Sequence, residues 1–164
     1  MSDWITDMGG LALGSRFRRL SDAMSGEVNK VYKRRDIELN SRHFPVLSLL
    51  HKQGKAGLSV TEMAEQLKIT HVSVSQTVKQ LEKQGYCARK AHKNDERILK
   101  IYLTSKANKL LKDELLSVWQ VIKDVTEERL AVIEGDFWQG LAVAEENLSR
   151  YSLAEEILNR LQAK

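Results

Sequence analysis

The most constraining feature of this sequence is a pair of helix starts joined by a very short link. Ser59 and Glu62 have the spacing of a capping box, and Thr70 is placed to cap a second helix. Only Lys68 and Ile69 lie between the two predicted helices. Because so short a link forces two helices to cross sharply, the sequence predicts a helix-turn-helix.

The second of these helices, at 70–84, has one apolar and one polar face. Val74, Val78 and Leu81 recur at i, i+4 and i+7 and predict a buried stripe. The outward face carries no acidic residue, and its glutamine, serine and lysine side chains suit contacts with bases and phosphates of duplex DNA. The candidate DNA-binding residues here are Thr70, His71, Val72, Ser73, Ser75, Gln76, Lys79 and Gln80. An ordinary solvated helix face is the alternative that this pattern alone leaves open.

A basic β-hairpin follows this helix. Residues 86–92 and 97–104 predict its strands, and residues 93–96 predict its turn. Alternation of Leu99, Ile101 and Leu103 with Lys100 and Tyr102 predicts that the second strand is half-buried. The basic residues gather at the tip, where arginine suits a narrow, electronegative minor groove. We expect Arg89, Lys93 and Arg97 to bind DNA and Asp95 to orient Arg97. A charged tip that only keeps the hairpin soluble is the alternative.

Apolar residues also recur at helical spacing near both ends of the chain. The N-terminal set predicts one long helix, weakened near its start by glycines, and comprises Trp4, Met8, Leu11, Phe17, Leu20, Met24, Val28, Val31 and Tyr32. The C-terminal set predicts another and comprises Leu110, Leu111, Leu115, Val118, Trp119, Ile122 and Val125. One winged lobe cannot cover both faces, so we expect a homodimer, with a monomeric helical cap as the alternative.

The expected fold class is therefore mainly α with a small β wing. A winged helix-turn-helix DNA-binding domain at 39–104 would be flanked by an N-terminal dimerisation helix at 1–38 and C-terminal dimerisation helices at 105–164. A helix expected from Asn40 to Gly54 completes the central domain, with Pro45 near its first turn.

Composition and motifs exclude several other classes. The chain of 164 residues has 26 Lys and Arg against 22 Asp and Glu, a net charge of +4, so its charge leans basic without a polycationic tail. The sequence contains no leader or bilayer-spanning apolar run, which favours a cytoplasmic protein. No phosphate loop, nucleophile elbow or zinc motif occurs, so we expect no enzyme, no cofactor and no metal. Cys87 is either a small buried hydrophobe or, beside Arg89 and Lys90, a redox-sensing thiol.

From about Leu39 to Leu116 the sequence resembles the MarR (multiple-antibiotic-resistance regulator) family. The matching positions are Leu67, Ile69-Thr70, Val74-Ser75, Val78, Leu81-Glu82-Lys83, Gly85, Arg89, Asp95-Glu96-Arg97 and Leu103-Thr104. The resemblance implies a homodimeric winged-helix transcription factor whose first and last helices interlock, with the 70–84 helix in the major groove and Arg97 in the minor groove. Ala107 departs from the glycine usual in the family, and the tail beyond Val125 is longer than in many members.

The expected function is thus sequence-specific binding of double-stranded DNA at a pseudo-palindromic operator, as a repressor rather than an activator. The resemblance also implies a ligand pocket between the dimer spine and each DNA-binding lobe, and a small-molecule effector would release the DNA from there. Val31, Phe44, Leu47 and Leu115 are the candidate lining residues, although each can also be plain core. The alternative function is a winged helix that only docks another protein, without specific DNA binding.

Overall fold

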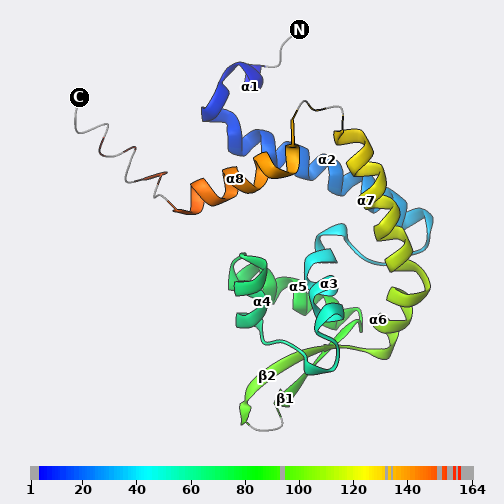
Figure 1. Ribbon diagram of the computed structural model, residues 1–164. Helices are drawn as coiled ribbons and strands as arrows, with labels where there is room; N and C mark the ends of the chain where they lie inside the picture. The colour runs from blue at the N-terminus through cyan, green and yellow to red at the C-terminus, as the bar shows by residue number, and fades with distance from the viewer. Residues whose placement is uncertain are drawn as a thin grey trace. The chain divides into compact units, whose positions relative to one another are not determined.

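The computed structural model describes residues 4–92 and 95–131 and, beyond these, Ile133, residues 135–150, Leu153, Ala154, Ile157 and Asn159 (Figure 1). The chain forms two compact units, Met1–Leu116 and Ser117–Lys164. Each unit is described by itself. None of the described helices is long and apolar enough to cross a membrane.

The first unit begins with helical segments. A short helix α1, Trp4–Asp7, is followed by a 3-10 turn, Gly9–Ala12, and by the long helix α2, Leu13–Arg34. The predicted long N-terminal helix is confirmed as α2, and the weakening expected from the glycines near its start is confirmed by the 3-10 turn at Gly9–Ala12.

The Asn40 cap predicted from sequence is confirmed, with a 3-10 turn inserted after it. Ser41–His43 form that turn, and α3 follows at Phe44–Gln53. The Asn40 side chain accepts a hydrogen bond from the Arg42 amide at 2.9 Å. Pro45 lies in the first turn of α3, where an amide has no partner within the helix, so its missing N–H costs little.

The helix-turn-helix is confirmed in both its caps and its core. In α4, Val60–Leu67, the Glu62 carboxylate accepts from the Ser59 amide at 2.6 Å, and the Ser59 hydroxyl accepts from the Glu62 amide at 3.2 Å. Lys68 ends this helix in the left-handed conformation, with φ of 52°, and Thr70 caps α5, His71–Lys83. The predicted stripe of α5 is fully buried.

The hairpin is an antiparallel pair, β1 at Cys87–His92 and β2 at Asp95–Leu103. The second strand begins at Asp95, two residues before the predicted start. Ile101 is buried as expected, but Leu99 is 50% exposed, so the prediction for Leu99 is wrong because the hairpin extends beyond the core there. Leu58 adds a bridge to Ile101, through hydrogen bonds of 2.8 and 3.1 Å, and joins the hairpin to the segment before α4.

A helical run starts after the hairpin. Its parts are α6 at Ser105–Leu110, a π-helical turn at Leu111–Leu115 and α7 at Leu116–Leu130. The Thr104 hydroxyl caps it by accepting from the Ala107 amide at 3.2 Å. The predicted long helix is confirmed as a continuous run, with the π turn as an irregularity that apolar periodicity does not reveal.

The second unit contains most of α7 and the helix α8, Phe137–Arg150. Asp136 caps α8 by accepting from the Gln139 amide at 2.9 Å. A capping box that the sequence predicts at Ser152 and Glu155 falls outside the described residues.

The core of the first unit brings together one face from each of its central elements. Figure 1 shows α3, α4 and α5 lying together beside the hairpin. The largest fully buried side chains are Val46, Leu47, Leu50, Met63, Val74, Val78, Leu81, Ile101, Leu111 and Leu115. Burying each such side chain stabilises the fold by about 1.5–3 kcal/mol, so this cluster fixes how the helices and the hairpin are placed.

Two glycines between α3 and α4 offer a matched test of this packing. Gly54 and Gly57 both have φ of +61°, but a Cβ at Gly54 would meet nothing within 4 Å, whereas one at Gly57 would lie 2.6 Å from the Tyr102 ring and 2.9 Å from the Ile101 carbonyl oxygen. Both alanine variants bear backbone strain. Only Gly57→Ala also forces the bridge to the hairpin apart.

We predict that Gly57→Ala lowers the free energy of unfolding by about 2 kcal/mol more than Gly54→Ala does. Urea denaturation followed by circular dichroism measures both. Equal losses in the two variants would contradict the close packing of Gly57 against β2.

Candidate nucleic-acid interface

The N-terminal half of α5 presents a free polar face. Val72 is 66% exposed, and Gln76 and Lys79 are exposed beside it. Neither of these two polar side chains has a hydrogen-bond partner among the described residues. The buried stripe on the opposite side holds this face outward, so the amide of Gln76 and the ammonium of Lys79 are available to a ligand of the helix.

The residues at the start of α5 have local roles as well. The Thr70 hydroxyl accepts from the Ser73 amide at 3.2 Å and lies 2.9 Å from the Ser73 hydroxyl. His71 is exposed and Ser75 is half-buried. Of the predicted contact residues at this end, Thr70 and Ser73 thus already form the helix cap, and Ser75 is the least accessible.

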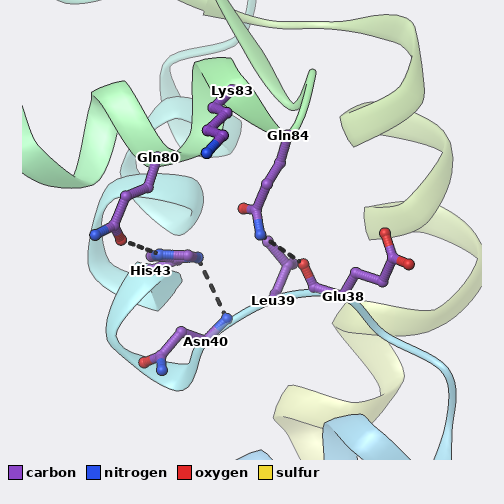
Figure 2. A pocket seen from close by; sticks show the side chains of 7 residues that line it. All are labelled: Glu38, Leu39, Asn40, His43, Gln80, Lys83 and Gln84. Carbon is purple, nitrogen blue, oxygen red and sulfur yellow. Dashed lines mark hydrogen bonds between the residues drawn. The ribbon is translucent and has the colours of Figure 1, made fainter.

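The C-terminal half of α5 is held on both flanks by polar contacts. On one flank the Gln80 side chain is hydrogen-bonded to His43 at 2.9 Å, and the Gln84 side-chain nitrogen Nε2 donates to the Glu38 carbonyl oxygen at 3.1 Å (Figure 2). On the other flank the Arg89 guanidinium on β1 pairs with Glu82 at 2.9 Å. Glu82, the one acidic residue of α5, is thereby neutralised.

The hairpin lies beside this helix and is tied to α4. The Lys100 ammonium pairs at 3.2 Å with Glu62, the carboxylate that also caps α4. The amide hydrogen bond from Ser59 is the main reason that the pKa of Glu62 is lowered, with the Lys100 contact acting in the same direction. Lys90 lies over the Tyr102 ring, 5.9 Å from its centre.

The predicted tip residues are only partly described. Arg97 and Asp95 belong to β2, but their side chains, like Lys93, fall outside the part of the chain that the structure describes. The strand pairing is irregular between Ala91 and His92, close to the tip. Arg89, the remaining predicted residue of the hairpin, is exposed but engaged with Glu82.

An open pocket of about 610 Å³ lies against the end of α5. Its lining residues are Glu38, Leu39, Asn40, His43, Gln80, Lys83 and Gln84. The side-chain oxygen Oε1 of Gln84 is buried there and has no hydrogen-bond partner in the part of the chain that the structure describes. None of the four predicted pocket residues lines it: Leu47 and Leu115 are buried, and Val31 and Phe44 are exposed.

His43 is the residue of this region that the sequence did not reveal. It is buried and takes the third position of the Asn40 capping box, where a glutamate or glutamine is usual. The sequence could have indicated this role, because a histidine three residues after a capping residue can accept a hydrogen bond from that residue's amide. Elsewhere, the described His, Cys, Asp and Glu side chains form no cluster of three or more suited to a metal ion.

Comparison with known proteins gives a family match for the central part of the chain. A model of the MarR family matches residues 39–99, the segment that holds the helix-turn-helix and most of the hairpin. Over this segment the chain is similar to the MarR family.

Solved structures of MarR-type proteins share the fold at low sequence identity. An S. aureus MepR–DNA complex has a TM-score of 0.67 and 22% identity over 84% of this chain and 97% of that chain. A mutant E. coli MarR with operator DNA has a TM-score of 0.65 and 16% identity over 90% and 99% of the two chains. The regulator BldR from Sulfolobus solfataricus has a TM-score of 0.62 and 21% identity over 92% and 100%. Among curated proteins, none matches this chain.

Cys87, the first residue of β1, contacts α5. It is 4% exposed, and its thiol is 3.6 Å from the Val78 carbonyl oxygen. Burial, and then the negative charge of Glu82, raise the pKa of the Cys87 thiol to about 12, while Arg89 lowers it only in part. The burial of the thiol and its raised pKa favour the buried-hydrophobe interpretation over a redox-sensing thiolate.

We predict that the native protein reacts with iodoacetamide at pH 8 at least tenfold more slowly than the same protein unfolded in urea, because unfolding returns the thiol to an ordinary pKa near 8.5. Mass spectrometry of timed samples measures both rates. A native rate equal to the unfolded rate would show that Cys87 is an accessible, ionising thiol.

Proposed function

We propose that this chain is a transcriptional regulator that binds double-stranded DNA in a sequence-specific manner. The observation that carries the proposal is the N-terminal half of α5: an outward face without acidic residues, with Gln76 and Lys79 unengaged among the described residues. A helix of this kind fits the major groove, where glutamine reads adenine and lysine contacts phosphate.

The family supports this assignment. Two of the similar structures are DNA complexes, of S. aureus MepR and of E. coli MarR. By analogy with them, α5 is the reading helix of this chain, and the β1–β2 hairpin is a wing that lies along the neighbouring strand. Arg97, near the tip of that wing, is our candidate for the minor groove, with Asp95 and Lys93 beside it.

A pair of substitutions on α5 tests base reading against phosphate binding. We predict that Gln76→Ala lowers the binding free energy by about 1–3 kcal/mol and does so through one base pair of the preferred site. Lys79→Ala should weaken binding to all sequences alike and reduce the slope of log affinity against log salt concentration by about one. Binding to duplexes selected from random sequences, titrated at several salt concentrations, measures both effects.

Two results would count against the proposal. Equal affinity of wild type and both variants would exclude α5 as the contact surface. Weak wild-type binding that does not fall with salt would instead favour the protein-docking alternative.

We further propose that the regulator is a homodimer formed by its end helices. Large apolar side chains are exposed on α2 at helical spacing, among them Phe17, Leu20 and Met24, each 42–46% exposed. The second unit exposes a further set, which includes Val121, Val125, Trp138 and Val143. A second copy would cover both, and two α5 helices about 34–36 Å apart would then read a pseudo-palindrome. The regions 1–38 and 105–164 are the dimerisation parts in this proposal, and 39–104 is the DNA-binding domain.

A charge placed on the apolar face of α2 tests the dimer. We predict that Leu20→Glu gives a monomer at micromolar concentration, whereas Ser15→Glu, which adds the same charge on another exposed face of α2, leaves the dimer intact. Sedimentation velocity measures the mass in both cases. A dimer that survives Leu20→Glu would place the interface elsewhere.

Repression, and release by a small molecule, are the finer parts of the proposal. A bound regulator at an operator excludes other proteins from that DNA, which favours repression. An effector would act by changing how α5 is held, and the open pocket beside its C-terminal half adjoins the contacts that hold it.

A further inference from the structure

The contact between Gln80 and His43 separates two glutamines that look alike in sequence. Gln76 and Gln80 are one turn apart on α5, and both are exposed. Gln76 has no hydrogen-bond partner among the described residues, whereas the side-chain oxygen Oε1 of Gln80 lies 2.9 Å from the His43 Nε2 atom (Figure 2). A ligand that approaches α5 therefore finds the Gln76 side chain free to bind and the Gln80 side chain already hydrogen-bonded.

The hydrogen bonds of His43 fix which atom of Gln80 is used. The His43 Nδ1 atom accepts from the Asn40 amide at 3.3 Å, so Nδ1 carries no hydrogen and Nε2 carries the one hydrogen of the neutral ring. Nε2 must then donate to the side-chain oxygen Oε1 of Gln80. A bidentate contact with adenine needs both the oxygen and the nitrogen of a glutamine amide, and in Gln80 the oxygen is already taken.

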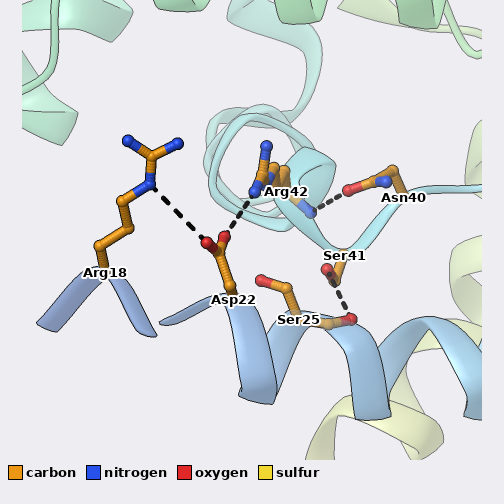
Figure 3. Close-up of polar contacts among 6 residues, drawn as sticks. All are labelled: Arg18, Asp22, Ser25, Asn40, Ser41 and Arg42. Carbon is orange, nitrogen blue, oxygen red and sulfur yellow. Dashed lines mark hydrogen bonds and ion pairs between the residues drawn. The ribbon is translucent and has the colours of Figure 1, made fainter. Parts of the chain in front are cut away.

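His43 is in turn fixed to α2. The Ser41 amide donates to the Asn29 side chain at 2.7 Å, and the Ser41 hydroxyl donates to the Ser25 carbonyl oxygen at 3.4 Å. The Arg42 guanidinium donates to Asp22 at 2.8 Å (Figure 3). The turn Ser41–His43 is thus held on α2 at one side and holds α5 through Gln80 at the other.

We propose that Gln80 and His43 are positioning residues that set the orientation of α5 against α2, and that Gln80 does not read a base. The proposal rests on the DNA-binding function proposed above. It replaces the sequence-based expectation that Gln80 is a contact residue of the same kind as Gln76. His43 is 4% exposed, so any effect of this side chain on DNA affinity has to pass through another residue.

Two substitutions of His43 separate its two hydrogen bonds. In His43→Asn the side-chain oxygen takes the place of Nδ1. This variant keeps the hydrogen bond from the Asn40 amide and loses the one to Gln80. In His43→Gln the side-chain nitrogen takes the place of Nε2. This variant keeps the hydrogen bond to Gln80 and loses the one from the Asn40 amide. Gln80→Met removes the acceptor at similar side-chain length.

The measurement is affinity and base preference on the duplex that the wild-type protein selects from random sequences. We expect Gln80→Met and His43→Asn each to weaken binding by about three- to tenfold, and the double variant to be no weaker than either. Base preference stays that of the wild type at every position. His43→Gln, although less stable, binds the duplex more tightly than His43→Asn.

A second measurement uses the protein without DNA. Hydrogen exchange of the α5 amides near Gln80 should speed up in Gln80→Met and His43→Asn and stay close to wild type in Gln76→Ala. Unchanged exchange in both variants would overturn the positioning role.

The outcomes distinguish this proposal from the proposed function. A wild-type protein that selects a duplex, with Gln80→Met altering preference at one base pair and His43→Asn binding normally, would overturn the positioning role alone. A wild-type protein that selects no duplex would overturn the proposed function and this proposal with it.

Discussion

The burial of Val74, Val78 and Leu81 is the interaction on which the rest of this structure depends. All three side chains are fully buried, and α5 packs against α3, α4 and the hairpin strand β1. Because α5 completes one turn every 3.6 residues, its three stripe residues lie on one side, and burying that side fixes the rotation of the helix about its own axis. Any other rotation would expose these apolar side chains, at a cost of about 1.5–3 kcal/mol each. The outward placement of Val72, Gln76 and Lys79 is therefore a consequence of packing on the opposite side.

Rotation alone does not fix the tilt of a helix, and here the polar contacts matter. The pairs His43–Gln80 and Arg89–Glu82 hold opposite flanks of the C-terminal half of α5. Partly exposed contacts of this kind contribute about 1 kcal/mol or less to stability, so their main effect is on geometry. The N-terminal half has no such flanking contacts among the described residues and remains open to a ligand. The wing is fixed to the same core by Leu58 and by the Lys100–Glu62 pair, so helix and wing keep a defined relation.

The features that the sequence predicted well are those set by neighbours within one or two helical turns. The caps at Ser59 and Thr70 and the buried stripe of α5 depend on spacings of three to seven residues, and spacing is visible in a sequence. Contacts between distant segments were not predicted. His43 and Gln80 are 37 positions apart, and the exposure of Leu99 depends on how far the hairpin extends past the core, which strand alternation does not encode. The two features that changed the view of the site, the engagement of Gln80 and of Arg89, both belong to this second kind.

The two sides of α2 explain how such distant contacts can matter for regulation. One side is joined to the lobe through Asp22, Ser25 and Asn29, which hold the turn before α3. The other side exposes the apolar stripe of Phe17, Leu20 and Met24. If a second copy of the chain covers that stripe, the position of α2 is set by the dimer, and the turn transmits it to α5 through His43. An effector then has no need to touch the DNA-contacting face. In the proposed mechanism a small shift of α2 against the turn would suffice, because α5 is anchored at the end remote from its free face. A change of tilt there would displace Gln76 from the base that we propose it reads.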